Sequence, residues 1–138
     1  MPFTVLVVDD ASFMRSMIGD IFARGPFVIA GEAENGVEAI RLYRELRPDL
    51  TTMDIVMPQM DGITALREIV RLDPAAKVVM CSARGQEALI AEAIEAGASD
   101  FIVKPFQPGR VLKVAQSVLG LNDRFLPLGQ PEASGEVR

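Results

Sequence analysis

Residues 4–10 have the sequence TVLVVDD, in which an apolar, β-branched run ends in two aspartates. Such a run predicts a buried β-strand. Similar short apolar runs follow at residues 27–30, 50–53, 77–81 and 101–103. Longer amphipathic segments alternate with these runs and predict helices at residues 12–23, 35–47, 61–72, 86–95 and 108–119. Strands and helices in strict alternation predict an α/β fold with a parallel sheet covered by helices on both faces.

The helical spacing also predicts which side chains face the sheet. In the first helix, the apolar side is expected to comprise Phe13, Met17, Ile18, Ile21 and Phe22. Asn35 is expected to cap the second helix. The inward residues of that helix are expected to be Val37, Ile40 and Leu46.

The composition limits the chemistry that the chain can perform. It has 138 residues, of which 49% are hydrophobic, so it can form one domain with a hydrophobic core. It contains no histidine and a single cysteine, Cys81, which excludes histidine bases, histidine metal ligands and an intramolecular disulfide. The net charge of −5 argues against nucleic acid binding, which depends on lysine and arginine. Any chemistry must therefore use carboxylates, hydroxyls and lysine.

The two ends of the chain bear on location and domain organisation. The N-terminal apolar run is broken by Asp9 and Asp10, so it is neither a signal peptide nor a membrane span. We therefore expect a soluble, cytoplasmic protein. Residues 1–120 contain all the predicted strands and helices and are expected to form one domain. Residues 121–138 contain several prolines and glycines and few core-forming residues, which predicts a disordered C-terminal tail.

Polar side chains follow four of the predicted strands. The first strand is followed by Asp9 and Asp10, the third by Asp54, the fourth by Ser82 and the fifth by Lys104. In an open parallel sheet the carboxyl ends of the strands meet at one edge, where binding sites form. Each residue alone has an ordinary explanation as a cap, a turn or a surface residue. Together, however, they place three carboxylates in one crevice, which is unfavourable unless cations lie between them. Lys104 supplies one positive charge, and Mg²⁺ is the ion best suited to oxygen ligands without histidine or cysteine.

Several stretches of the sequence resemble the receiver domains of two-component response regulators. They are VVDD at residues 7–10, MD at 53–54 with MP at 57–58 and DG at 61–62, CSA at 81–83, and FIVKPF at 101–106. The resemblance extends over about residues 3–120 and includes every strand end named above. It implies a flavodoxin-like (βα)5 fold, a doubly wound parallel sheet with the strand order 2-1-3-4-5.

The resemblance also implies a role for each residue at the strand ends. Asp54 is expected to accept the phosphoryl group, and Lys104 and Ser82 are expected to bind it. Mg²⁺ is expected to be bound by Asp54 together with Asp9, Asp10 and the backbone carbonyl of Val56. The chain is thus expected to be a signalling switch that catalyses only its own phosphorylation and slow dephosphorylation.

The output of such a switch is a change of shape. If the Ser82 hydroxyl moves toward a phosphoryl group, Phe101 can rotate into the vacated space. The alternative, less favoured interpretation is that Phe101 is an ordinary core aromatic. The resemblance implies a cis peptide between Lys104 and Pro105. It places the partner surface on the fourth helix, fifth strand and fifth helix, with the residues Ile90, Val103 and Val114.

The quoted stretches are most similar to receivers that act in chemotaxis. That similarity implies a monomer with the histidine kinase CheA, the flagellar switch proteins FliM or FliY and a CheC- or CheX-type phosphatase as partners, and no membrane partner. Val56 and Arg84 depart from the enteric pattern, which has an amide and an acidic side chain at these places. Another stand-alone receiver of a phosphorelay, or the receiver half of a CheB-like methylesterase, remains an alternative. A phosphohydrolase of the haloacid dehalogenase class is set aside, because its two aspartates are separated by one residue, whereas Asp9 and Asp10 are adjacent.

Overall fold

A computed structural model of the chain describes residues 2–121. The elements, in chain order, are β1 (Phe3–Val8), α1 (Ser12–Phe22), β2 (Phe27–Ala33), α2 (Gly36–Leu46), β3 (Leu50–Asp54), α3 (Gly62–Leu72), β4 (Val78–Ser82), α4 (Glu87–Glu95), β5 (Asp100–Val103) and α5 (Pro108–Val118). The predicted alternation is confirmed. β2 continues beyond residue 30 because, after a register shift, it pairs with β1 as far as Val8 and Ala33. The tail predicted for residues 121–138 lies, except for Leu121, outside the described residues.

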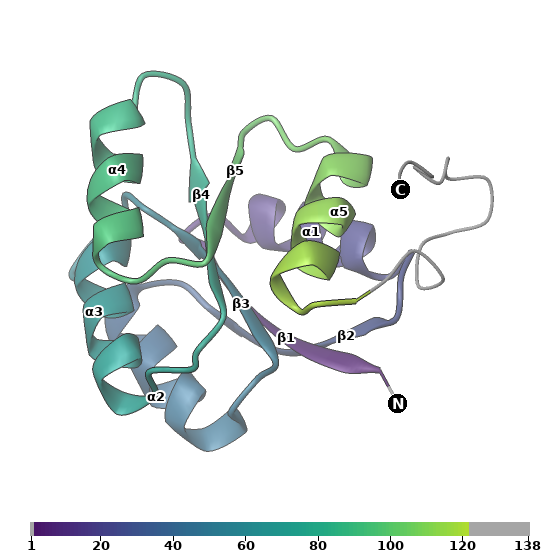
Figure 1. The fold of residues 1–138 in the computed structure, drawn as a ribbon, viewed down its shortest axis with the longest axis horizontal. Helices are drawn as coiled ribbons and strands as arrows, with labels where there is room; N and C mark the ends of the chain where they lie inside the picture. Colours follow the sequence, from purple (N-terminus) through teal and green to yellow (C-terminus); the bar gives the residue numbers. More distant parts are fainter. Residues whose placement is uncertain (1, 122–138) are drawn as a thin grey trace.

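The five strands form one sheet in the order β2-β1-β3-β4-β5, and every neighbouring pair is parallel. The predicted fold class and strand order are therefore confirmed. Figure 1 shows α2, α3 and α4 on one side of the sheet and α1 and α5 on the other. Because all strands run in the same direction, the residues that follow β1, β3, β4 and β5 lie at one edge of the sheet.

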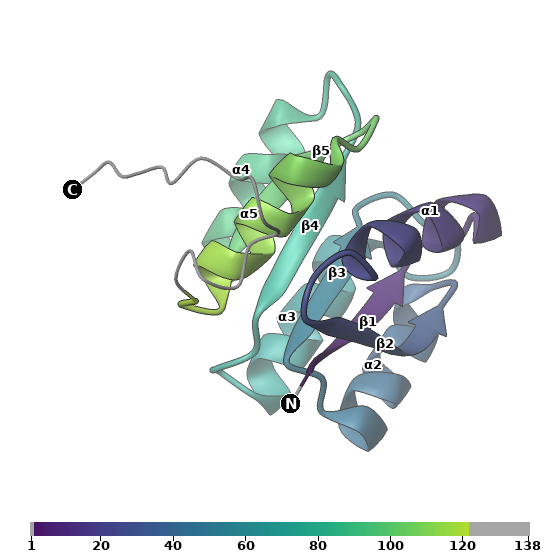
Figure 2. The ribbon, with the colours of Figure 1, turned by 90° about the vertical axis from the view of Figure 1, so that its right-hand side faces the viewer.

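Each face of the sheet has its own hydrophobic core. Leu6 and Val8 of β1 belong to the core under α2, α3 and α4, whereas Val5 and Val7 belong to the core under α1 and α5. This alternation follows from the period of two residues in a strand. Figure 2 shows the second of these faces, with α1 and α5 toward the viewer. Because helices cover both faces, the three central strands β1, β3 and β4 are almost wholly buried.

Three side chains that the helical spacing placed inward are exposed. The buried residues of α2 are Gly36, Ala39 and Tyr43. Successive residues of a helix are rotated by about 100°, so Val37 points away from this line and is 54% exposed. Leu46, in the last turn, is also exposed. In α1 the buried residues begin at Ile18, while Phe13 lies in the first turn and is 70% exposed.

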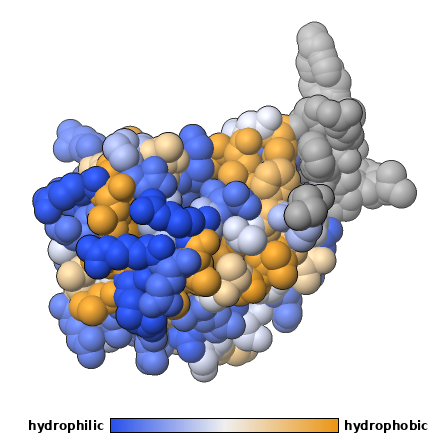
Figure 3. Space-filling model, turned by 90° about the horizontal axis from the view of Figure 1, so that it is seen from below, coloured by the Kyte–Doolittle hydropathy of each residue, from blue (hydrophilic) through white to orange (hydrophobic). Residues whose placement is uncertain are grey.

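The outer surface of α2 and α3 is strongly hydrophilic. Seen from below, hydrophilic side chains gather over the part of the molecule where these helices lie (Figure 3). On α2, Arg41 forms ion pairs with Glu38 at 3.6 Å and Glu45 at 3.2 Å. Within residues 2–121, none of the helices has the length and apolar character needed to cross a bilayer.

Candidate functional site

The predicted cluster of charged side chains is present at the carboxyl edge of the sheet. The Nζ atom of Lys104, just after β5, lies 3.0 Å from Oδ2 of Asp9 and 3.3 Å from Oδ2 of Asp54. One carboxylate oxygen each of Asp9, Asp10 and Asp54 lies within 4.8 Å of the others. Asp9 is buried, Asp54 is half-buried and Asp10 is exposed. The structure thus brings together three carboxylates and an ammonium from the ends of three strands, β1, β3 and β5.

The turn after β3 holds Asp54 in place. The backbone N–H of Gly62 donates a hydrogen bond of 2.7 Å to the carbonyl oxygen of Ile55, which brings the start of α3 back onto the end of β3. A Cβ atom at Gly62 would collide with the backbone oxygen of Asp54, so only glycine fits here. The carboxylate of Asp61 caps α3 by accepting a hydrogen bond of 2.8 Å from the N–H of Thr64.

Burial and neighbouring charges shift the pKa values at this edge of the sheet. Burial raises the pKa of Asp54 above its ordinary value, and the neighbouring charges of Asp9 and Asp10 raise it further, against the opposing effect of Lys104. Burial alone would lower the pKa of Lys104, but its hydrogen bond to Asp9 and the charges of Asp54 and Asp9 together raise it. The lysine is therefore held as a cation, and the site still carries an excess of negative charge.

Two neighbouring residues of β4 complete the edge. Ser82 is fully buried, and its hydroxyl oxygen has no hydrogen-bond partner within residues 2–121. A buried hydroxyl without a partner is unfavourable, so it marks a place where a ligand atom could bind. Cys81 lies beside Asp54 in the register of β3 and β4. Its thiol is buried, and burial, followed by the charge of Asp54, raises its pKa.

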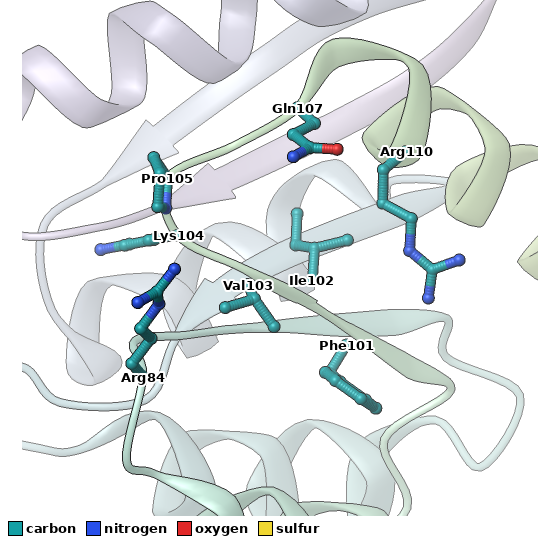
Figure 4. Close-up of a pocket in the computed structure, with 8 residues that line it drawn as sticks. All are labelled: Arg84, Phe101, Ile102, Val103, Lys104, Pro105, Gln107 and Arg110. Atoms are coloured by element: carbon teal, nitrogen blue, oxygen red, sulfur yellow. The ribbon is translucent and has the colours of Figure 1, made fainter.

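A cavity of about 340 Å³ lies next to this edge, between the segment after β4 and α5. Its lining includes Phe101, Val103 and Lys104, with Arg84 and Arg110 on opposite sides of β5 (Figure 4). Neither arginine forms an ion pair with another residue of the described chain. The cavity therefore presents both polar and apolar surface, with positive charge at its sides.

The structure corrects one member of the expected partner surface. Val114 is only 3% exposed, because it belongs to the core that α5 forms against the sheet. In this conformation its side chain therefore offers almost no surface to a partner. Val103 is exposed, and Ile90 and Phe101 are half-buried against the other core. The expected cis peptide between Lys104 and Pro105 is present.

Two basic residues at the site were not predicted from the sequence. Arg110, on α5, lines the cavity. Arg15, on α1, donates a hydrogen bond of 2.6 Å from Nη1 to the backbone oxygen of Asp9. Neither occurs in a recognisable spacing relative to the aspartates, and their contacts arise only when the helices pack against the sheet.

The family of the chain follows from comparison with known proteins. Residues 5–116 match the model of the response regulator receiver domain. The chain therefore belongs to the receiver domain family of response regulators.

Within that family, the chain is similar to proteins of chemotaxis. It is 57% identical to the chemotaxis protein CheY of Thermotoga maritima, over 83% of this chain and 95% of that protein. It is 55% identical to CheY of Bacillus subtilis, over 86% of this chain and 99% of that protein. Its fold matches a chain in the crystal structure of the CheX-CheY-BeF3-Mg+2 complex from Borrelia burgdorferi with a TM-score of 0.82, at 42% identity over 86% of this chain and 90% of that chain. These likenesses favour a CheY-like receiver over the phosphorelay and methylesterase alternatives.

Proposed function

We propose that this chain is a phosphorylation-controlled regulator of chemotaxis. It accepts a phosphoryl group on Asp54 from a histidine kinase of the CheA type and signals by binding the flagellar switch protein FliM or FliY. The observation that carries the proposal is the joint contact of Lys104 with Asp9 and Asp54, close to a buried Ser82 hydroxyl that has no hydrogen-bond partner among the described residues. The identity to CheY proteins supports the chemotaxis assignment. We further propose that it acts in the cytoplasm as a monomer without nucleic acid or membrane partners.

The residues at the carboxyl edge fit a magnesium ion. Asp9, Asp10 and Asp54 offer carboxylate oxygens close enough to share one hard cation, and the backbone carbonyl of Val56 would be a further ligand. Bound Mg²⁺ would neutralise negative charge on the phosphoryl oxygens. Burial, together with the charges of Asp9 and Asp10, raises the pKa of Asp54, and a cation bound beside these carboxylates would favour their ionised forms.

The proposed reaction uses few groups of the protein. A carboxylate oxygen of Asp54 attacks phosphorus, and the bond from phosphorus to the histidine nitrogen of the donor breaks, leaving its electron pair on that nitrogen. The donor lies on another molecule, since this chain contains no histidine. Lys104 and the Ser82 hydroxyl would then donate hydrogen bonds to the phosphoryl oxygens. Apart from this reaction and the slow hydrolysis of the aspartyl phosphate, in which water takes the phosphoryl group and the Asp54 carboxylate is released, we propose no enzymatic activity.

The cavity beside β5 fits the output of the switch. Movement of the Ser82 hydroxyl toward the phosphoryl group would leave room into which Phe101 rotates, and Phe101 lines the cavity. Val103 and the partly buried Ile90 supply apolar contact surface. Arg84 and Arg110 favour a partner segment that carries carboxylates. A phosphatase of the CheC or CheX type would have to reach the neighbouring edge of the sheet.

A binding measurement tests this proposal. We expect beryllofluoride with Mg²⁺, used as a phosphate mimic, to tighten binding of purified FliM or FliY about tenfold, which is an ordinary coupling between two sites. Arg110→Glu should weaken that binding, because it reverses a charge in the cavity. Arg44→Glu on α2 makes the same charge change outside the cavity and serves as the control. Equal affinity with and without the mimic would contradict the proposed output.

The rate of reset depends on residues beside Asp54. Val56 is 57% exposed and lies two residues after Asp54, where a polar side chain could hold a water for hydrolysis. We expect Val56→Asn to speed loss of the phosphoryl group about fivefold, the effect of roughly 1 kcal/mol. Adding Arg84→Glu should speed it further, since Arg84 would otherwise pair with the phosphoryl group.

The measurement is the decay of phosphorylated protein after the phospho-donor is removed. Val37→Asn is the matched control, because Val37 is similarly exposed but lies on α2. Decay of the Val56→Asn protein at the unaltered rate or more slowly would show that water access at this residue does not limit the reset.

A further inference from the structure

Arg15 joins the end of β1 to β2 through its side chain. It lies in the first turns of α1, and only 16% of its side chain is exposed. Its Nη1 donates a hydrogen bond of 2.6 Å to the backbone oxygen of Asp9, and its Nε donates one of 2.8 Å to Oε1 of Glu32 on β2. A guanidinium can bridge two acceptors in this way because its donors form a rigid planar fork.

With this bond, all the polar atoms of Asp9 are engaged. Its N–H donates to the backbone oxygen of Ala33 at 3.0 Å. Its Oδ1 accepts from the N–H of Ala11 at 2.9 Å, and its Oδ2 accepts from Lys104 at 3.0 Å. The backbone oxygen belongs to the peptide between Asp9 and Asp10, so Arg15 fixes the plane of that peptide. The orientation of this peptide also sets the position of the Asp10 Cα atom, and hence of its exposed side chain.

We propose that Arg15 is a positioning residue for the cation site, with Glu32 as its anchor. It holds the Asp9–Asp10 peptide so that both carboxylates approach Asp54 closely enough to share one ion. The inference rests on the proposed magnesium site but assigns Arg15 no contact with the ion.

The positive charge of Arg15 and its positioning role have opposite effects on the affinity for Mg²⁺. A guanidinium near the site repels a divalent cation, although Glu32 offsets part of that charge. If charge were its only effect, removing Arg15 would tighten Mg²⁺ binding. If positioning dominates, removing it weakens binding, because the two carboxylates lose their fixed relation to Asp54. The sign of the change in Mg²⁺ affinity therefore distinguishes the effect of charge from the effect of positioning.

The experiment is titration calorimetry of Mg²⁺ into the metal-free full chain. We expect Arg15→Met to weaken Mg²⁺ binding about tenfold, the usual scale for residues that orient metal ligands. Arg15→Lys keeps the charge but loses the fork, and should also weaken binding. Arg41→Met removes an arginine from an exposed ion pair on α2 and should leave the Kd unchanged.

Glu32→Gln provides a second, independent readout. If Arg15 and Glu32 act as one unit, the double variant Arg15→Met with Glu32→Gln should bind Mg²⁺ no more weakly than Arg15→Met alone. If the two residues acted only through their charges, the substitutions would change the Mg²⁺ affinity in opposite directions. The double variant would then bind Mg²⁺ more weakly than Arg15→Met alone, because it also loses the negative charge of Glu32.

Several results would overturn the inference. One is an Arg15→Met protein that binds Mg²⁺ as tightly as the unaltered chain or more tightly. Another is a lower thermal stability in chelator with an unchanged Kd, which would make Arg15 merely structural. If Arg15→Met does not fold, Arg15→Lys and Glu32→Gln give the same comparison. If the unaltered chain does not bind Mg²⁺, the proposed cation site itself is wrong. That outcome differs from failure of the positioning role, in which the unaltered chain binds Mg²⁺ and Arg15→Met binds it equally well.

Discussion

Replacement of Asp54 by asparagine should abolish phosphorylation by a small donor such as acetyl phosphate. The substitution removes the attacking carboxylate while keeping the size of the side chain, and an amide is not a nucleophile for this reaction. Asp9 and Asp10 should not substitute for it, because Asp9 is buried with both oxygens engaged and Asp10 is placed to bind the cation. The measurement is phosphoryl incorporation by intact-mass spectrometry, with signal expected only at background.

The Asp54→Asn protein should remain folded. Because the pKa of Asp54 is raised in the folded state, its ionised form opposes folding above that pKa, and asparagine removes this effect. We therefore expect no loss of stability at neutral pH in a denaturant titration. Asp20→Asn, on the exposed side of α1, is the matched control and should be labelled normally. Stable labelling of Asp54→Asn at a comparable level would show that another residue is the acceptor.

Removal of divalent cations should lower the rate of phosphorylation by at least about a hundredfold. An anionic donor must approach three carboxylates that Lys104 only partly neutralises, so the lost cation is a large electrostatic contribution. Asp10→Ala should weaken Mg²⁺ binding by at least about tenfold, since it removes a ligand rather than a residue that orients one. The rate is followed with acetyl phosphate in chelator and then with increasing Mg²⁺.

The comparison with Asp20→Ala controls for the loss of one negative charge. This protein should bind Mg²⁺ and be phosphorylated like the unaltered chain, because Asp20 lies on α1 outside the acidic cluster. Undiminished phosphorylation in chelator would contradict the role given to the cation.

The sequence predicted the architecture and the cluster of charges because both depend on strands. A buried parallel strand is a short apolar run, and the residue that follows it lies at a known edge of the sheet. Asp9, Asp54 and Lys104 could therefore be placed together although they are far apart in the chain. The order of the strands came from the family resemblance and agrees with the observed sheet.

What the sequence did not predict depends on how helices pack. The amphipathic pattern does not determine the rotation of a helix about its axis when small residues form part of its buried side, as Gly36 and Ala39 do in α2. Val37 was placed inward for this reason. Val114 was placed outward on a helix whose apolar line is buried. The bond from Arg15 to the backbone of Asp9 involves no side chain of the partner residue, so residue types give no signal for it.

The burial of Cys81 has a consequence for how the switch responds to oxidants. This is the only thiol of the chain, it lies beside the proposed phosphoryl acceptor, and its raised pKa keeps it protonated. Oxidising and alkylating reagents attack the thiolate, which is neither formed nor accessible while the sheet is intact. Modification would have to await opening of the central strands. A thiol reagent would therefore report opening of the sheet rather than the chemistry at its edge.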